Sequence, residues 1–308
     1  MSELPLPPES RVLGRHLGAG GIEVSPLAWG MWRLADNGRS AADAAKLVHA
    51  ALDAGITFLD TADIYGFDGN GGFGDAEVLL GEVLAAEPGL RDRMVLATKG
   101  GILPPLPYDQ SADYLRKAID DSLARLKVDS VDLWQIHRPD ILAHPQETAR
   151  VLDDVVASGK VRSLGVSNFT IHQTAALNHL LGTKLVTTQP EISALRIDCF
   201  ENGELDQAMM LGLTPMAWSP LGGGRLAVPE TPRDKAVAAA LDSVAEAQGV
   251  SRTVCAYSWL MAHPAGIIPI IGSQNAERIA ESAEALKVRW TRTDWYAVLV
   301  AARGVPLP

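Results

Sequence analysis

The sequence predicts an α/β protein built on one (β/α)8 TIM barrel, and three observations lead to this fold class. Short apolar segments alternate about eight times with segments of helical periodicity, which is typical of parallel β/α architecture. The 308 residues suit one barrel, which typically needs roughly 250 residues. No linker or break in composition divides the chain, so residues 1–308 are expected to form a single domain.

Eight short segments, rich in apolar and often β-branched residues, are predicted as the parallel strands of the barrel. In chain order they are Pro26–Trp32, Thr57–Ala62, Met94–Lys99, Val131–His137, Val161–Val166, Leu185–Gln189, Pro215–Trp218 and Ile267–Ile271. Before them, Gly18-Ala19-Gly20-Gly21 indicates the turn of a short N-terminal β-hairpin. An open dinucleotide-binding sheet would need G-x-G-x-x-G after its first strand, but this run precedes that strand and has Glu23 as its sixth residue.

Amphipathic segments between the strands are predicted as helices. The clearest are Ala41–Ala54, Asp113–Leu126, Thr148–Ser158, Asp234–Gln248 and Ala276–Leu286, with extra C-terminal helices at Ser251–Ala262 and near Thr293–Arg303. Ser40 or Asp43 can cap the first helix, and Gly55 follows its last turn. The proline-rich residues 1–10 resemble a disordered lead and lack the charged and apolar regions of a signal peptide.

Composition excludes several classes of partner. A formal net charge of −10 disfavours nucleic acid and anionic membrane surfaces, and no apolar stretch approaches the length of a bilayer span. The two cysteines, Cys199 and Cys255, are far apart, which suits a reducing cytoplasm. The seven histidines lack metal-ligand spacing, so no metal is expected. Nothing in the composition fixes the oligomeric state.

Polar residues follow the predicted strands where the active sites of such barrels gather. Asp60 and Tyr65 come at and after the second strand, Lys99 ends the third, and His137 ends the fourth. Each residue alone is more often a cap, a rim charge or a structural side chain. Four such groups at one end of neighbouring strands are expected to converge on one pocket.

These four groups suit proton transfer to a carbonyl oxygen. A free tyrosine, with a pKa of about 10, is a poor proton donor at neutral pH. A nearby lysine ammonium favours the phenolate and lowers that pKa, and a carboxylate keeps the lysine charged. Histidine can orient or polarise the carbonyl oxygen. The set therefore predicts protonation of a developing alkoxide while a hydride reaches the carbon.

With these motifs in view, the chain resembles the aldo-keto reductase superfamily, and the bacterial branch related to potassium-channel β-subunits in particular. The resemblance covers nearly the whole chain, from Gly14 through Glu281. Its most specific motifs are F-L-D-T-A-D-I-Y-G, A-T-K-G, I-H-R-P-D, G-V-S-N-F, M-A-W-S-P-L-G-G-G and I-I-G-S-Q-N-A-E-R-I. The resemblance implies an NAD(P)H-dependent oxidoreductase that reduces an aldehyde or ketone.

It also implies residue roles. Tyr65 would be the general acid, Lys99 and Asp60 would tune it, and His137 would orient the substrate carbonyl. Ser167, Asn168 and Gln189 would hold the nicotinamide carboxamide, and Trp218 would stack on its ring or serve core packing. The remaining expected cofactor contacts are Gly30, Met31, Ser219, Leu221, Gly222, Gly224, Arg225, Gly272, Ser273, Gln274, Arg278, Glu281 and Ser282. For the Leu221–Arg225 segment, a plain flexible loop is the other interpretation.

Cofactor preference depends on Arg278 and Ser273, which match positions that grip the 2′-phosphate of NADP. NADP(H) is preferred, and NAD(H) stays possible because Gly272 and Ser282 depart from the lysine and asparagine of many relatives. Arg278 can alternatively be an ordinary surface arginine. Trp32 and the glycine-rich loop 66–74 are expected at the mouth of the substrate pocket, and a solvent-exposed turn is an equal interpretation of that loop.

Two other functional classes compete with the reductase. An NADPH-binding redox-sensing or regulatory subunit would keep the four groups and turn over slowly. A metal-dependent sugar isomerase would need clustered carboxylate and histidine ligands, which the sequence does not offer. The sequence leaves the natural substrate open.

Overall fold

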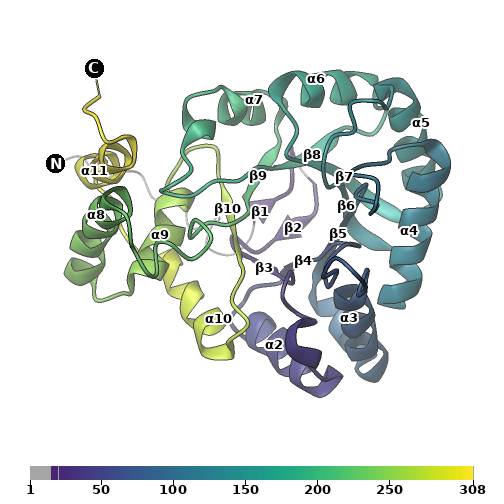
Figure 1. Ribbon diagram of the computed structural model, residues 1–308, viewed down its shortest axis with the longest axis horizontal. Helices are drawn as coiled ribbons and strands as arrows, with labels where there is room; N and C mark the ends of the chain where they lie inside the picture. The colour runs from purple at the N-terminus through teal and green to yellow at the C-terminus, as the bar shows by residue number, and fades with distance from the viewer. Residues whose placement is uncertain (1–14, 20, 308) are drawn as a thin grey trace.

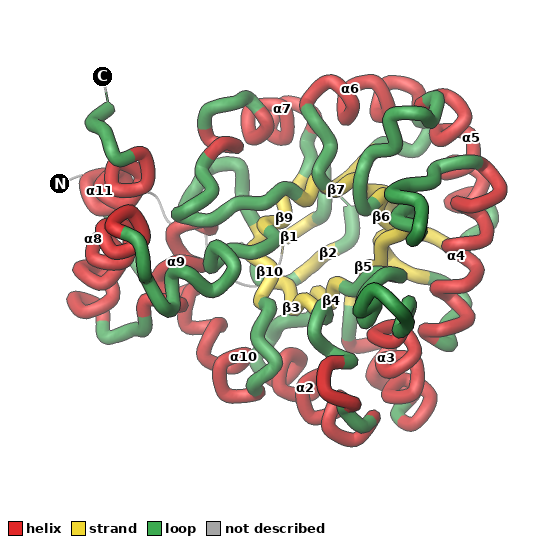
Figure 2. The backbone as a smooth tube through the Cα atoms, in the orientation of Figure 1, coloured by secondary structure: helices red, strands yellow, loops and turns green. Residues whose placement is uncertain are grey.

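The barrel is closed by eight parallel strands, with the helices arranged around it (Figure 1, Figure 2). The structure, a computed structural model, describes residues 15–19 and 21–307. The strands run in the order β10-β3-β4-β5-β6-β7-β8-β9. Their bounds are β3 Ala28–Gly30, β4 Phe58–Asp60, β5 Val95–Gly100, β6 Val131–Ile136, β7 Val161–Ser167, β8 Leu185–Gln189, β9 Thr214–Ala217 and β10 Ile268–Ile271. The predicted (β/α)8 fold class is thus confirmed.

The helices match the predicted amphipathic segments and add three more. They are α2 Ala41–Asp53, α3 Asp75–Ala86, α4 Ala112–Leu126, α5 Pro145–Ala157, α6 Ile171–Leu180, α7 Glu204–Leu211, α8 Pro232–Gln248, α9 Arg252–Met261, α10 Ala276–Ser282 and α11 Arg292–Arg303. Short 3-10 helices span Asp36–Gly38, Pro88–Arg93, Asp198–Phe200 and Ala283–Lys287. Helix α2 is capped by Ser40, which accepts from the backbone N–H of Asp43, and Gly55 follows it with φ 78°.

An N-terminal hairpin covers the end of the barrel where the strands begin. Its strands are β1 Arg15–His16 and β2 Glu23–Val24, which pair antiparallel. The backbone N–H of Gly18 donates to Oγ1 of Thr214, the first residue of β9 (3.0 Å). Gly20 of the predicted turn and the expected disordered lead, residues 1–10, lie outside the described residues.

The buried apolar residues form two separate cores. A large one fills the space between the strands and the surrounding helices. A smaller one lies inside the barrel and includes Phe58, Leu133, Met216 and Ile268, with Leu17 of the hairpin region. Burying one large apolar side chain on folding contributes about 1.5–3 kcal/mol to the stability of the protein. Because this apolar core fills the end of the barrel where the strands begin, the polar side chains inside the barrel lie toward the other end, where the strands finish.

A helix that crosses a membrane has to be long and apolar. No helix in the described part of the chain has both the length and the apolar character for it.

Candidate active site

The four groups singled out in the sequence lie at one end of the barrel. Asp60 is the last residue of β4, Lys99 is the residue before the last of β5, and His137 directly follows β6. Tyr65 lies in the loop after β4. Because β4, β5 and β6 are parallel neighbours, their C-terminal ends share one rim, and the structure brings the four side chains together there.

Asp60 and Lys99 form an ion pair that is shielded from water. The Lys99 Nζ lies 2.6 Å from Asp60 Oδ2 and donates a second hydrogen bond to the carbonyl oxygen of Thr61 at 2.8 Å. Lys99 is fully buried and Asp60 is 2% exposed. Burial alone would lower the pKa of Lys99, but the charge of Asp60, with the contribution of Tyr65, raises it above its usual value. The lysine therefore carries its charge at neutral pH.

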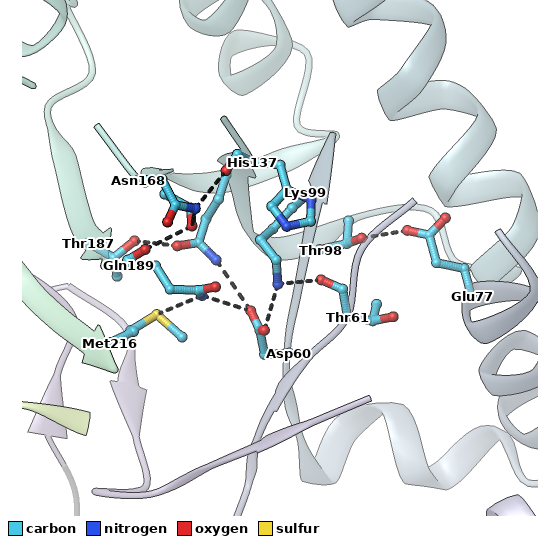
Figure 3. A network of polar contacts seen from close by, with 12 residues as sticks. Asp60, Thr61, Glu77, Thr98, Lys99, His137, Asn168, Thr187, Gln189 and Met216 are labelled. Atoms are coloured by element: carbon cyan, nitrogen blue, oxygen red, sulfur yellow. Dashed lines mark hydrogen bonds and ion pairs between the residues drawn. The ribbon is translucent and has the colours of Figure 1, made fainter. Parts of the chain in front are cut away.

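The second oxygen of Asp60 is held by two amides (Figure 3). Gln135 Nε2 donates to Oδ1 at 3.3 Å and Gln189 Nε2 donates to it at 3.1 Å. Thr187 in turn donates its hydroxyl to Gln135 Oε1 at 3.1 Å. The carboxylate is thus satisfied at both oxygens, which fixes its orientation in the barrel. Sequence reasoning missed Gln135, although Gln135 follows Leu133 by two positions along β6 and therefore shares the strand face that points into the barrel.

Tyr65 stands between the lysine and the histidine. The Lys99 Nζ lies 4.9 Å from the centre of the Tyr65 ring, and the His137 ring meets it edge-on with centroids 5.8 Å apart. Burial raises the pKa of Tyr65, and the opposing attraction of Lys99 is smaller, so the pKa lies above its usual value. The charge of Lys99 lowers the pKa of Tyr65, as expected from the sequence. The loss of hydration of the buried phenol raises this pKa by more, so the hydroxyl keeps its proton.

His137 is neutral in this environment. Burial, followed by the charges of Lys99 and Arg138, holds the pKa of His137 well below its usual value. Its Nδ1 is buried and has no hydrogen-bond partner among the described residues. Its backbone carbonyl accepts a hydrogen bond from Asn168 Nδ2 at 3.1 Å. A neutral imidazole can donate one hydrogen bond and accept another.

The expected carboxamide contacts gather at the ends of β7, β8 and β9. The Ser167 hydroxyl donates to the carbonyl oxygen of Gln189 at 2.8 Å, and Asn168 Nδ2 donates to Ser167 Oγ at 2.8 Å. Trp218 Nε1 donates to Asn168 Oδ1 at 3.0 Å. Asn168 has φ 60°, a left-handed conformation that asparagine tolerates. These four residues form one polar cluster beside His137.

The segment after β9 is turned back on itself by glycines. Gly222, Gly223 and Gly224 have φ values of 61°, 69° and 92°, and nothing lies within 4 Å of a Cβ placed on Gly223 or Gly224. Ser219 Oγ accepts from the backbone N–H of Gly223 at 2.8 Å, and Leu221 is partly buried against the core. The Arg225 guanidinium pairs with Asp234 of α8. The loop therefore leaves steric room beside Gly223 and Gly224, while the backbone N–H groups of Gly222 and Gly224 already donate to carbonyl oxygens within the loop and the Arg225 side chain is engaged.

An open pocket of about 360 Å³ lies between the loops that follow β3 and β10. Gly272, Ser273, Gln274 and Arg278, four of the residues predicted as cofactor contacts, line it. The backbone carbonyl of Gly30 accepts from Gln274 Nε2 at 3.3 Å. Five further lining residues were missed by sequence reasoning: Arg33, Asp36, Asn37, Arg39 and Asn275. The cluster of charges directly after the first predicted strand was the available signal.

Three other residues that were expected to contact the cofactor, Met31, Glu281 and Ser282, do not line this pocket. Met31 is buried in the core, and Ser282 is buried with its hydroxyl donating to the carbonyl oxygen of Ile279 at 2.6 Å. Glu281 is exposed. Trp32, two residues after the end of β3, is 63% exposed, in keeping with a place at a pocket mouth.

Comparison with known proteins places this geometry in a family. The model of the aldo/keto reductase family matches residues 26–299. The chain is 83% identical over 308 residues to a 6-dehydroglucose reductase of Novosphingobium aromaticivorans, covering 100% of both chains. It is 41% identical over 293 residues to a 6-dehydroglucose reductase of Agrobacterium fabrum, covering 92% of this chain and 96% of the relative.

A solved structure agrees on the fold. A thermostable aldo-keto reductase, crystallised with the inhibitor epalrestat, superposes with a TM-score of 0.80 at 23% identity, over 94% of this chain and 99% of that one. The chain belongs to the aldo/keto reductase family. It is accordingly an oxidoreductase that acts on small carbonyl compounds with a nicotinamide cofactor.

Proposed function

We propose that the protein reduces the aldehyde group of an oxidised hexose to a primary alcohol, with hydride from NADPH and with Tyr65 as the general acid. The observation that carries this proposal is the buried ion pair of Asp60 and Lys99, at 2.6 Å, beside the Tyr65 phenol and the His137 imidazole. Two relatives named 6-dehydroglucose reductase, at 83% and 41% identity, support a hexose aldehyde as the substrate.

The residues present fit a nicotinamide dinucleotide. Ser167, Asn168 and Gln189 offer hydroxyl and amide groups for the carboxamide, and Trp218 offers a flat face for the ring. The space beside Gly223 and Gly224, which carry no side chain, would let a pyrophosphate come close to the backbone. Bound in its reduced form, the cofactor supplies the hydride.

Tyr65 gives its proton to the substrate oxygen as negative charge develops there. Because burial raises its pKa above the usual value, the phenol holds the proton until negative charge develops on the substrate oxygen. The Lys99 ammonium, kept charged by Asp60, stabilises the phenolate left behind, and water then returns a proton to it. The reverse reaction, oxidation of the alcohol, runs through the same groups.

His137 orients the carbonyl. With its pKa well below the usual value, the imidazole stays neutral and donates a hydrogen bond to the substrate oxygen without releasing a proton of its own. Trp32, exposed after β3, would flank the substrate at the pocket mouth.

NADP(H) is the preferred cofactor in this proposal, supported by Arg278 and Ser273 in the pocket beside β10. NAD(H) lacks the 2′-phosphate and should bind more weakly. A cytoplasmic location is supported by Cys199 and Cys255, which are both free and buried.

The test is to mix the purified protein with 6-dehydroglucose and NADPH, and to follow both nicotinamide absorbance and product by NMR. We expect stoichiometric formation of glucose, with NADH supporting slower turnover at equal concentration. Simple aromatic aldehydes serve as comparison substrates. Tight NADPH binding without reduction of any aldehyde would contradict the proposal and favour the redox-sensing subunit instead.

A further inference from the structure

The pocket between the first and last βα loops has a wall that the expected cofactor contacts do not account for. Residues 272–275 and Arg278 form one side, and residues 33, 36, 37 and 39 form the other. The two loops are brought together because β3 pairs with β10 and α2 packs against α10 (Figure 1). The loop after β3 therefore belongs structurally to the same site as Arg278.

The pocket is positively charged in an acidic protein. Three guanidinium groups, of Arg33, Arg39 and Arg278, share it with one carboxylate, Asp36, which leaves a formal charge of +2 (three minus one). The chain as a whole carries −10. Within residues 15–19 and 21–307, none of these three arginines forms an ion pair, whereas Arg252 of α9 pairs with Asp242. Such a cluster of guanidiniums without ion-pair partners suits a bound dianion.

Neutral groups of the pocket complement the charge. Ser273 Oγ accepts from the backbone N–H of Asn275 at 3.2 Å, so its hydroxyl proton is free to donate to a ligand. Gln274 Oε1 is buried and, among the described residues, has no donor facing it. An unsatisfied buried acceptor of this kind is usually met by a ligand or by water.

The loop that carries the two additional arginines is held in place. Leu34 is fully buried, its backbone N–H donates to the carbonyl oxygen of Met31 at 2.9 Å, and its own carbonyl accepts from Arg39 Nε at 2.9 Å. That bond leaves the two terminal nitrogens of Arg39 for a ligand. The loop turns through Asn37 and Gly38, with φ values of 60° and 64°.

We propose that Arg33 and Arg39 bind the 2′-phosphate of NADPH together with Arg278, and that they determine the preference for NADPH over NADH. This inference rests on the proposed function and names residues that act on cofactor choice. Asp36 opposes the phosphate and limits the strength of the interaction. The glycine-rich loop after β9, at residues 221–225, is left to serve the pyrophosphate.

The experiment measures binding, independently of turnover. Dissociation constants of NADPH, NADH, adenosine 2′,5′-bisphosphate and adenosine 5′-monophosphate are determined by calorimetry for the wild type, Arg33→Gln and Arg39→Gln. We expect each variant to bind NADPH and the 2′,5′-bisphosphate about 10- to 100-fold more weakly, as for loss of a charged hydrogen bond. Binding of NADH and the 5′-monophosphate should change less than about twofold.

Two further variants sharpen the test. Asp36→Asn should tighten NADPH binding, because it removes the one negative charge of the pocket. Arg150→Gln is the matched control, since Arg150 is an exposed arginine on α5, which lies on the far side of the barrel from α2 and α10 (Figure 1). It should leave every dissociation constant unchanged.

Three results would overturn the inference. Equal losses for NADPH and NADH would assign the arginines to the pyrophosphate, and unchanged NADPH binding in both variants would remove them from the site. Losses as large in Arg150→Gln would reduce the effect to net charge. If the wild type binds NADPH and reduces aldehydes, such results reject only this inference, whereas a wild type that binds no dinucleotide rejects the proposed function itself.

Discussion

Gln189, at the end of β8, donates a hydrogen bond across the barrel to Asp60, at the end of β4, with 3.1 Å between Nε2 and Oδ1. The other oxygen of Asp60 holds Lys99 at 2.6 Å. The carboxylate therefore links the group expected to bind the nicotinamide to the group expected to tune the acid. If cofactor binding shifts Gln189, Asp60 would transmit that shift to Lys99 through its two hydrogen bonds.

Asp60→Asn should destabilise the protein by about 3–5 kcal/mol, because it leaves the fully buried Lys99 ammonium without its counter-charge. Urea unfolding measures the change. Asp53→Asn is the control: Asp53 pairs with Arg93 at 3.0 Å, but both side chains are largely exposed, so its loss should cost less than about 1 kcal/mol. A similar loss of stability in Asp60→Asn and Asp53→Asn would mean that the ion pair of Asp60 and Lys99 is not desolvated.

The pH dependence of stability should carry a contribution from His137. Its pKa is lower folded than unfolded, so below about pH 6.5 the unfolded chain binds more protons and stability falls as the pH falls. His263, whose pKa burial lowers to about 4, acts in the same direction. Urea unfolding at about pH 7 and about pH 5 should give a smaller acid loss for His137→Asn than for wild type. An unchanged loss would indicate an imidazole that is hydrated in the fold.

The stability of the Asp63→Asn variant relative to the wild type should increase as the pH rises. Burial, and then the charge of Glu77, raises the pKa of Asp63 well above its usual value, so the folded protein binds the extra proton and the wild type loses stability with rising pH from about 4. The asparagine has no such proton to lose. The free energies of unfolding of the two proteins, compared between about pH 4 and about pH 7, should diverge in favour of the variant. A constant difference would count against a protonated Asp63.

The strand positions could be predicted from the sequence, because parallel barrel strands are short apolar segments and their ends collect polar groups. Asp60, Lys99 and His137 were found in this way. Helix α3 was not predicted, since it buries apolar residues around most of its circumference together with Glu77 and so lacks a polar stripe. Helix α10 ends at Ser282 and continues as a 3-10 turn, which periodicity alone does not distinguish.

The polar partners could not be predicted, because they depend on distances across the barrel. Gln135 and Gln189 meet at Asp60 although 75 and 129 positions separate them from it. Arg33 and Arg39 join Arg278 only because the first and last strands close the barrel. The sequence could not predict the direction in which the pKa of Tyr65 shifts, because this direction depends on how far the effect of burial exceeds that of the Lys99 charge.

The central claim is that Tyr65 donates the proton to the carbonyl oxygen, and Tyr65→Phe tests it most directly. Tyr296→Phe, at an exposed ring on α11, is the control and should change neither turnover nor cofactor binding. For Tyr65→Phe we expect kcat for aldehyde reduction to fall by about 10²- to 10⁴-fold, while calorimetry gives an NADPH dissociation constant within about twofold of wild type. Aldehyde reduction by the Tyr65→Phe variant at the wild-type rate would contradict the account.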